Sequence, residues 1–198
     1  MPNLAEHKSS WLGLSSWSRD PQWTRGFNVE AQVTKSSGSA VLQLTYKVTG
    51  SVPDLLFLTE NAQTKFARNQ KLWEHSCFEI FASLPNQKSY SEWNLSSSGE
   101  WGHFRFSDYR IPLREEQTFD GGVQEIKFHK SASSLNLYSK IDLSSGDLGP
   151  SLIADKPIDL SLCLILENKK GEKGHWALAH LGEKPDFHMR ESFVLNFA

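Results

Sequence analysis

Apolar and polar residues alternate along most of this chain, and this period of two constrains the fold more than any other feature. In one segment, for example, Phe27, Val29, Ala31 and Val33 are separated by polar residues. Successive side chains of a β-strand point to opposite faces of a sheet, so the alternation predicts strands with one buried and one solvent-facing side. No segment has the spacing of an amphipathic helix.

About eleven such segments, separated by turn signals, predict an all-β fold. They are residues 27–33, 42–48, 55–58, 73–83, 90–95, 100–106, 123–129, 134–141, 158–167, 175–180 and 192–197. This number of short strands is typical of an immunoglobulin-like or jelly-roll β-sandwich of antiparallel strands. The length fits one domain, residues 1–198. Residues 1–18 are predicted to form a loosely packed N-terminal arm, although their apolar residues indicate some contact with the domain.

The charge and hydropathy of the chain argue against two classes of partner. The formal net charge is -2 and the isoelectric point is about 6.4, so no basic surface is expected for nucleic acid. The longest apolar run, residues 162–166, is far too short to span a membrane, and no polybasic amphipathic segment is present. Residues 1–10 lack the apolar stretch of a secretory signal. We therefore expect a cytoplasmic protein in which Cys77 and Cys163 are small buried side chains, with a disulfide as the alternative if their strands are neighbours.

Ionisable residues on three successive strands predict a polar patch. Glu79 lies in the middle of an apolar strand, and Glu92 and Asn94 share one face of the next. Arg105 follows on the third strand, on one face with His103. A buried carboxylate is costly unless it is paired, and Arg105 is the natural partner for Glu79 or Glu92 through a planar two-point ion pair. Two interpretations stay open: a buried ion-pair network without a ligand, or the polar floor of a ligand-binding site.

The C-terminal region contains a candidate set of metal ligands. His180, Asp186 and His188 are a two-histidine, one-carboxylate combination of the kind that binds transition metals. Their order and spacing match no well-known metal motif, and the other interpretation is that Asp186 holds a turn while the histidines bind backbone groups. The chain has no G-x-S-x-G, no H-E-x-x-H and no glycine-rich phosphate loop, so we predict no catalytic residue and no cofactor.

Tryptophan is abundant, with seven residues in the chain. An exposed Trp ring is typical of a sugar-binding face, because the flat ring stacks on the apolar side of a pyranose, whereas a buried ring fills the core. Trp73, Trp93, Trp101 and Trp176 all lie in predicted strands, and we expect at least two of them in the core. Trp101 or Trp176 is predicted to supply a stacking wall.

Three separated motifs resemble those of bacterial DOMON-like proteins. They are LWEHSCFEIF at residues 72–81, EWNLSSSGEW at residues 92–101 followed by Tyr109 and Arg110, and HWALAH at residues 175–180 followed by PDFH at residues 185–188. The resemblance covers roughly residues 40–197, and Ser97 stands where the family pattern has Pro.

The resemblance implies an immunoglobulin-like or jelly-roll sandwich related to family 9 carbohydrate-binding modules and to DOMON domains that bind haem or sugars. It implies no established activity. Haem-binding relatives use a Met and a His as axial ligands, whereas here Met189 is adjacent to His188. Neighbouring side chains that point in opposite directions cannot clamp one iron, so we expect no haem.

We therefore predict a non-catalytic module that binds a carbohydrate or a similar polar small molecule. Its predicted site residues are Glu79, Glu92, Asn94, Trp101, Arg105, Trp176, His180, Asp186 and His188. The carboxylates, the amide and the guanidinium would exchange hydrogen bonds with hydroxyls, the tryptophans would stack, and the last three residues would form the rim. The alternatives are a metal-dependent enzyme using His180, Asp186 and His188, a haem protein and a protein-partner-binding domain. The sequence makes no prediction of the oligomeric state.

Overall fold

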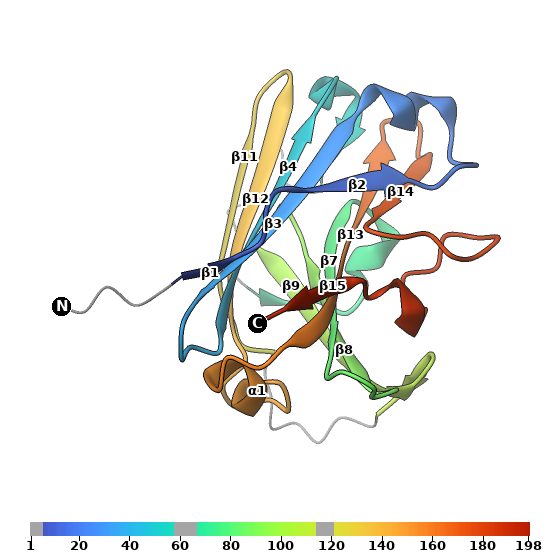
Figure 1. Cartoon of the computed structure of the whole chain (residues 1–198). Coiled ribbons are helices and arrows are strands. Elements are labelled where there is room, and N and C mark those ends of the chain that lie inside the picture. The colour runs from blue at the N-terminus through green and yellow to red at the C-terminus, as the bar shows by residue number, and fades with distance from the viewer. Residues whose placement is uncertain (1–5, 58–66, 114–120) are drawn as a thin grey trace.

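The protein is built almost entirely of β-strands, and the computed structural model describes residues 6–57, 67–113 and 121–198 (Figure 1). The strands are β1 (Glu6–Lys8), β2 (Leu12–Ser16), β3 (Asn28–Ser36), β4 (Val41–Thr49), β5 (Leu55–Leu56), β6 (Ala67–Arg68), β7 (Cys77–Ser83), β8 (Tyr90–Leu95), β9 (Glu100–Asp108), β10 (Ile111–Pro112), β11 (Val123–Lys130), β12 (Ser134–Asp142), β13 (Ile158–Asn168), β14 (Lys173–Ala177) and β15 (Leu195–Phe197). Within the described residues the other regular elements are the helix α1 (Gly149–Ile153) and 3-10 turns at Gln22–Gly26, Val52–Asp54, Leu72–Glu74 and Arg190–Ser192. The prediction of an all-β fold is confirmed. None of the helices in these ranges is long and apolar enough to cross a membrane.

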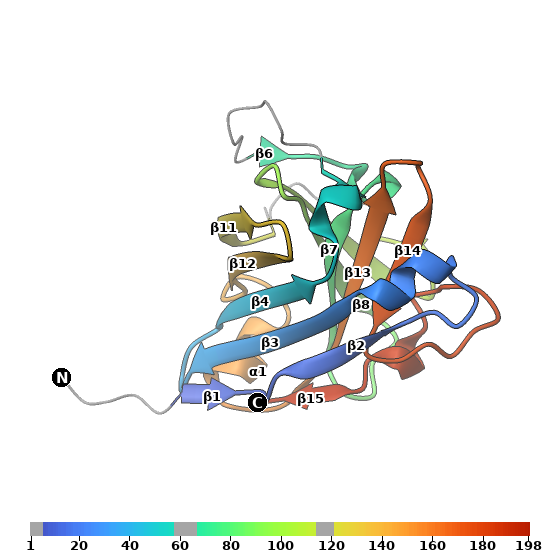
Figure 2. The same cartoon turned by 90° about the horizontal axis from the view of Figure 1, so that it is seen from above.

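These strands form one curled sheet rather than two separate sheets. Its main path runs β10-β9-β8-β7-β13-β14-β2-β3-β4-β12-β11, and the other strands pair with members of this path. Figure 2 shows the two halves facing each other, with β3, β4, β11 and β12 in one and β7, β8, β13 and β14 in the other. Pairings along the main path are antiparallel, whereas β6 pairs with β9 in parallel. The observed sheet is therefore continuous and mixed, where the sequence predicts a sandwich of antiparallel strands alone.

Strand β2 joins the two halves. Leu14 lies opposite Val29 of β3, and Ser16 lies opposite Trp176 of β14. The sequence pattern assigns these residues to an N-terminal arm because only two apolar positions alternate here, too few to predict a strand. The backbone hydrogen bonds to both neighbours nevertheless make β2 part of the sheet.

Alternate side chains of the two halves fill the space between them. The core includes Val29, Ala31 and Val33 of β3, Leu42, Leu44, Tyr46 and Val48 of β4, and Leu160, Leu162, Leu164 and Leu166 of β13. These residues follow the period of two in the sequence, which places them on the inner face as predicted.

Trp176 belongs to this core, which corrects the prediction that it forms a stacking wall. It lies opposite Leu164 on β13, and only 1% of the residue is exposed. Its ring centroid is 6.0 Å from that of Trp23 and 6.4 Å from that of Phe27. Cross-strand partners share one face, so the inward Leu164 fixes an inward Trp176. Trp101 is also in the core and is 8% exposed.

The chain after β14 folds back over the outer face of the same half. It contributes Phe187 and Phe193 to a second apolar cluster, whose buried members are Phe81, Tyr90, Cys163, Ile165, Ala177, Phe187 and Phe193. Every residue of β7 is consequently buried, as its large side chains of both parities predict. The strand predicted over residues 73–83 begins only at Cys77, because the preceding residues form a 3-10 turn. Leu58, at the end of another predicted strand, lies outside the described residues.

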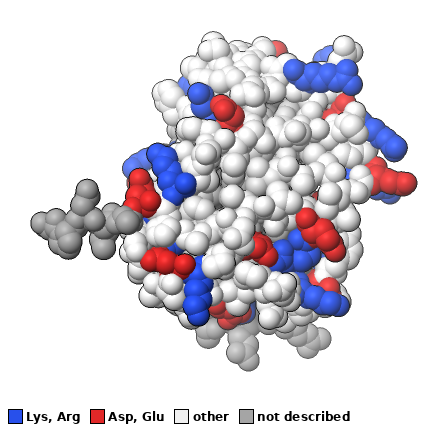
Figure 3. All heavy atoms as spheres, in the orientation of Figure 1, with Lys and Arg blue, Asp and Glu red and all other residues white. Residues whose placement is uncertain are grey.

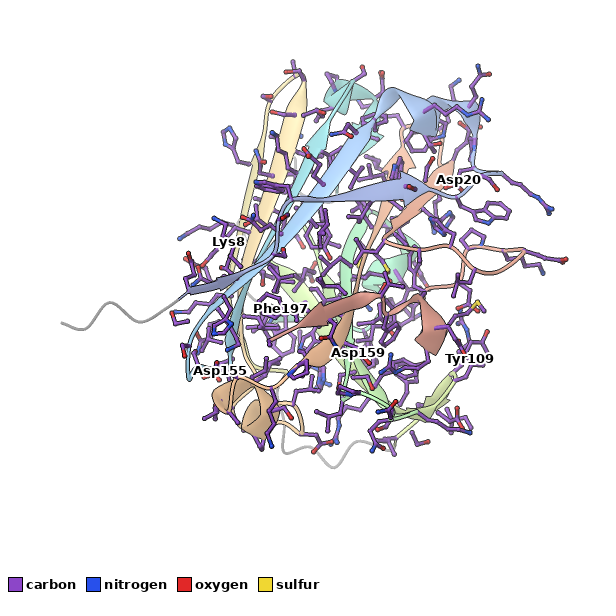
Figure 4. All side chains as sticks on the ribbon, viewed as in Figure 1. Lys8, Asp20, Tyr109, Asp155, Asp159 and Phe197 are labelled. Atoms are coloured by element: carbon purple, nitrogen blue, oxygen red, sulfur yellow. The ribbon has the colours of Figure 1, made fainter. Side chains whose placement is uncertain are left out.

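An ion pair between a buried lysine and a partly exposed aspartate fixes the connection that leads into β13. The fully buried Lys35 side chain of β3 pairs with Asp155, which follows α1 (Figure 4). Asp155 also accepts hydrogen bonds from Ser37 Oγ at 2.6 Å and from the Gly38 N–H at 3.1 Å. These three donors hold the pKa of Asp155 well below its usual range. On the face shown in Figure 3, acidic and basic side chains are interspersed around a largely uncharged area, in keeping with the small net charge.

The position of Trp176 predicts the effect of truncating it. Trp176→Ala should lower the free energy of unfolding by about 3–5 kcal/mol, because it removes a large side chain and leaves a cavity in the core. Urea denaturation monitored by circular dichroism measures this change. The matched control is Trp11→Ala, since Trp11 is 45% exposed, and its effect should stay within about 0.5 kcal/mol. Equal effects of the two substitutions would contradict the core assignment.

Candidate ligand-binding site

A cavity of about 430 Å³ opens on the outer face of the sheet, between strands β7 to β9 and the segment that follows β14. We call it the outer cavity, and its lining residues are Trp73, Glu79, Glu92, Phe104, Phe106, Arg110, Pro112, Ile165, His175, Pro185, Phe187 and His188. In Figure 4, Tyr109 marks the turn after β9, next to this segment. The cavity combines aromatic walls with a few convergent ionisable groups, which is typical of small-molecule sites.

Strand register brings three of the predicted site residues together in the floor. Glu79 of β7 lies opposite Asn94 of β8, and Glu92 lies opposite Phe81. Opposite residues share a face, so Glu79, Glu92 and Asn94 all project outward. Asn94 Nδ2 donates a hydrogen bond of 2.7 Å to Glu92 Oε1, and Cys77 Sγ lies 3.6 Å from Asn94 Oδ1.

Arg105 lies on the other face of the sheet, which corrects its predicted pairing with Glu79 or Glu92. Glu92 is opposite Phe104, so the next residue, Arg105, is opposite Ser91 and points the other way. There it pairs with Asp147 and lines a separate cavity of about 480 Å³. His103 and Trp101, on the same strand and with the same parity as Arg105, are buried on that side.

Arg110 supplies the positive charge that the sequence assigns to Arg105. Its backbone has φ of 53°, a left-handed conformation that is uncommon for a residue other than glycine. The Arg110 N–H donates to Tyr90 Oη at 3.1 Å, and its guanidinium donates to Asp186 Oδ1 at 3.0 Å. Tyr109 Oη donates to the other oxygen of Asp186 at 2.5 Å. The sequence signal for Arg110 was its place after the hairpin motif, but no pattern shows where a turn residue points.

Burial makes the two floor carboxyls hard to ionise. It raises the pKa of Glu92 to about 7, against the opposing effects of the Asn94 hydrogen bond and the Arg110 charge. It also raises the pKa of Glu79 well above its usual value, and the nearby Glu92 charge adds to that rise. Glu79 is 3% exposed, and its Oε1 has no hydrogen-bond partner among the described residues.

His188 is held as a neutral ring beside Glu92. Burial and the Arg110 charge lower the pKa of His188 to about 4, although Asp186 opposes this. Tyr90 Oη, which accepts the Arg110 N–H at 3.1 Å, is also 2.8 Å from His188 Nδ1. The other ring nitrogen, Nε2, is 3.7 Å from Glu92 Oε2.

The structure gives each of the three predicted metal ligands a different partner. His180 Nε2 is 2.9 Å from the Ser15 carbonyl oxygen, Asp186 accepts from Arg110 and Tyr109, and His188 contacts Tyr90. Over the described ranges, no group of three or more His, Cys, Asp or Glu is placed to hold a metal ion. His188 lies in the cavity, Asp186 orients Arg110 at its edge, and His180 contacts Phe187 from outside the cavity lining.

The exposed tryptophan of the site is Trp73 rather than Trp101 or Trp176. Trp73 is 40% exposed because it belongs to the 3-10 turn before β7, where it is free of the buried strand. Its ring meets that of Phe104 edge to face, with centroids 5.4 Å apart. The sequence pattern placed Trp73 inside a strand, so its exposure could not be predicted.

The raised pKa of Glu92 predicts a pH-dependent stability that one substitution removes. Below about 4.5 the carboxyl is protonated in both states, and as pH rises towards about 7 the unfolded chain loses the proton that the folded protein retains. The contribution of Glu92 to the free energy of unfolding of the wild type therefore decreases as pH rises over this range, because the folded state binds the proton more tightly than the unfolded chain does. Relative to wild type, Glu92→Gln should become more stable from pH about 4.5 to about 7 and level off above that, with a slope of at most about 1.4 kcal/mol per pH unit.

Urea denaturation at four pH values checks this prediction. His188, with a lowered pKa, contributes the opposite trend between about 4 and 6.5, and taking the difference from wild type removes its share. Glu183→Gln changes an exposed carboxylate and should leave the difference flat. A flat difference for Glu92→Gln as well would contradict the burial-raised pKa.

Comparison with known proteins gives a likeness in fold. No family model and no curated protein matches the sequence. A solved structure from Bacteroides uniformis, described as a "putative carbohydrate-binding protein", superposes with a TM-score of 0.64 at 15% sequence identity. The match covers 96% of this chain and 84% of that chain. At this identity the likeness concerns the fold alone.

Proposed function

We propose that this protein is a non-catalytic module that binds a carbohydrate in the outer cavity. The observation that carries the proposal is the half-exposed Trp73 ring at the edge of a cavity whose floor is built from Glu79 and Glu92. A flat aromatic surface beside buried hydrogen-bonding groups matches a pyranose, which has apolar C–H faces and a rim of hydroxyls.

In this proposal the lining residues make different kinds of contact with the sugar. Trp73, with Phe104 against its ring, forms a wall on which a sugar ring packs. Glu92 and Glu79 accept hydrogen bonds from hydroxyls, and Arg110 donates to ring or hydroxyl oxygens from the turn after β9. Trp101, Arg105 and Trp176 lie on the opposite face and have no part in this proposal.

The finer assignment forms part of the same proposal. The three motifs favour a DOMON-like jelly roll related to family 9 carbohydrate-binding modules, and we place the protein in the cytoplasm as part of the same proposal. The carbohydrate-binding description of the Bacteroides protein, which shares the fold, supports a sugar ligand here. A binding module is favoured over a metal-dependent enzyme because His180, Asp186 and His188 contact separate partners.

A thermal-shift screen with neutral and amino sugars tests the proposal. A bound sugar at 100 times its dissociation constant should add about 2.7 kcal/mol to the free energy of unfolding, which is a readily visible shift. Trp73→Ala should then weaken the binding of that sugar by about tenfold or more, measured by calorimetry, because it removes the stacking wall. Its own stability should fall by no more than about 1 kcal/mol, since Trp73 is exposed.

Trp11→Ala is the matched control and should leave the affinity unchanged, because Trp11 is exposed on a different part of the chain. A sugar that binds equally well to wild type and to Trp73→Ala would remove the outer cavity from the proposal. A screen in which no sugar shifts the unfolding transition would overturn it.

A further inference from the structure

The outer cavity carries more acidic than basic groups once each ionisable residue is matched with its partner. Arg110 is the one permanently charged cation among the described residues that line it, and its guanidinium is held by Asp186 at 3.0 Å. His175 contacts the buried Asp20 carboxylate at 3.0 Å, so any charge on its ring is already compensated. Glu79 and Glu92 are left in the floor without a cation of their own.

Glu79 also has an unused hydrogen-bond acceptor. Its Oε1 is buried, and no donor among the described residues reaches it. A buried acceptor without a donor costs about 1–3 kcal/mol, more if it is charged, and a ligand that supplies the donor recovers this cost. Above the floor, Phe104, Phe106 and Phe187 line the cavity, and aromatic faces attract cations.

From these contacts we infer that the sugar bound in the outer cavity carries a protonated amine, that is, it is an amino sugar whose ammonium donates to Glu79 and Glu92. This inference rests on the proposed function and names its ligand class. The ammonium supplies three N–H donors and the missing positive charge in one group. A neutral hydroxyl supplies one donor and no charge, so it leaves the two carboxyls competing for ionisation in a buried site.

The elements packed around Glu79 bring few charged groups to it. Strand β7 itself presents the Cys77 thiol, which interacts with the Glu79 carboxyl, and strand β8 presents Glu92 and Asn94. Strand β13 presents Cys163 and Ile165, and the segment after β14 presents the neutral His188. Arg110 approaches from the turn after β9, but its charge is shared with Asp186. The described elements packed against Glu79 therefore leave it without a full counter-ion.

Calorimetry at pH 7 with matched pairs of sugars tests this inference. The pairs are glucosamine with glucose, galactosamine with galactose, and mannosamine with mannose, as methyl glycosides. In at least one pair the amino sugar should bind at least about tenfold more tightly than its neutral parent. In Glu79→Gln the preference for the amino sugar over its neutral parent should fall below about threefold, whatever the change in the affinity for the neutral sugar itself. Glu92→Gln tests the same loss if Glu79→Gln does not fold, and Glu183→Gln should keep the full preference.

The outcomes separate this inference from the proposed function. Neutral sugars that bind as well as their amino partners, with binding lost in Trp73→Ala, would overturn the inference and leave the carbohydrate site standing. Absence of binding in all pairs would overturn both. Cyclohexylamine, an ammonium on a ring without hydroxyls, is the third arm: binding as tight as that of the amino sugar would support the cation preference and overturn the carbohydrate assignment.

Discussion

The hydrogen bonds that β2 makes with both β3 and β14 are the constraint on which the rest of the structure depends. They carry one sheet from the first half into the second, so that the two halves close over a shared core (Figure 1). With most of its inner face packed against the other half, the half that contains β7, β8 and β13 presents its outer face to a ligand. The segment after β14 covers part of that face, and the outer cavity lies where the cover is incomplete.

Alternation in the sequence was sufficient to predict the strands and the inner face of most of them. It could not predict the register between strands, and the register determines which of the predicted site residues share a face. Glu79, Glu92 and Asn94 lie on strands whose apolar partners mark the core side clearly. Strand β9 has aromatic residues on both faces, because its outer face is covered too. The pattern of apolar and polar residues therefore does not show which face is inner, and it wrongly placed Arg105 on the side of the carboxyls.

The other functional residues that were missed are held by turns. Trp73 and Arg110 are placed by a 3-10 turn and by a left-handed residue, respectively, and neither geometry follows from a pattern of apolar positions. Their importance appears only when distant segments meet, as Arg110 does with Asp186 across 76 positions of sequence. The fold could therefore be predicted as a class, whereas the chemistry of its site depends on contacts that exist only in the folded chain.

The positions of the two free cysteines make them natural probes of the site. Both cysteines are buried beside Glu79: Cys77 lies two positions before it on β7, and Cys163 lies opposite it on β13 and packs in one cluster with Phe187 and Phe193 of the C-terminal segment. A thiol in such a place reacts with a labelling reagent only while the layer above it is open, and burial raises the pKa of both thiols, which slows the reaction further. The native chain thus carries its own reporters of local opening beneath the site, and a bound ligand would register as slower labelling without any engineered probe.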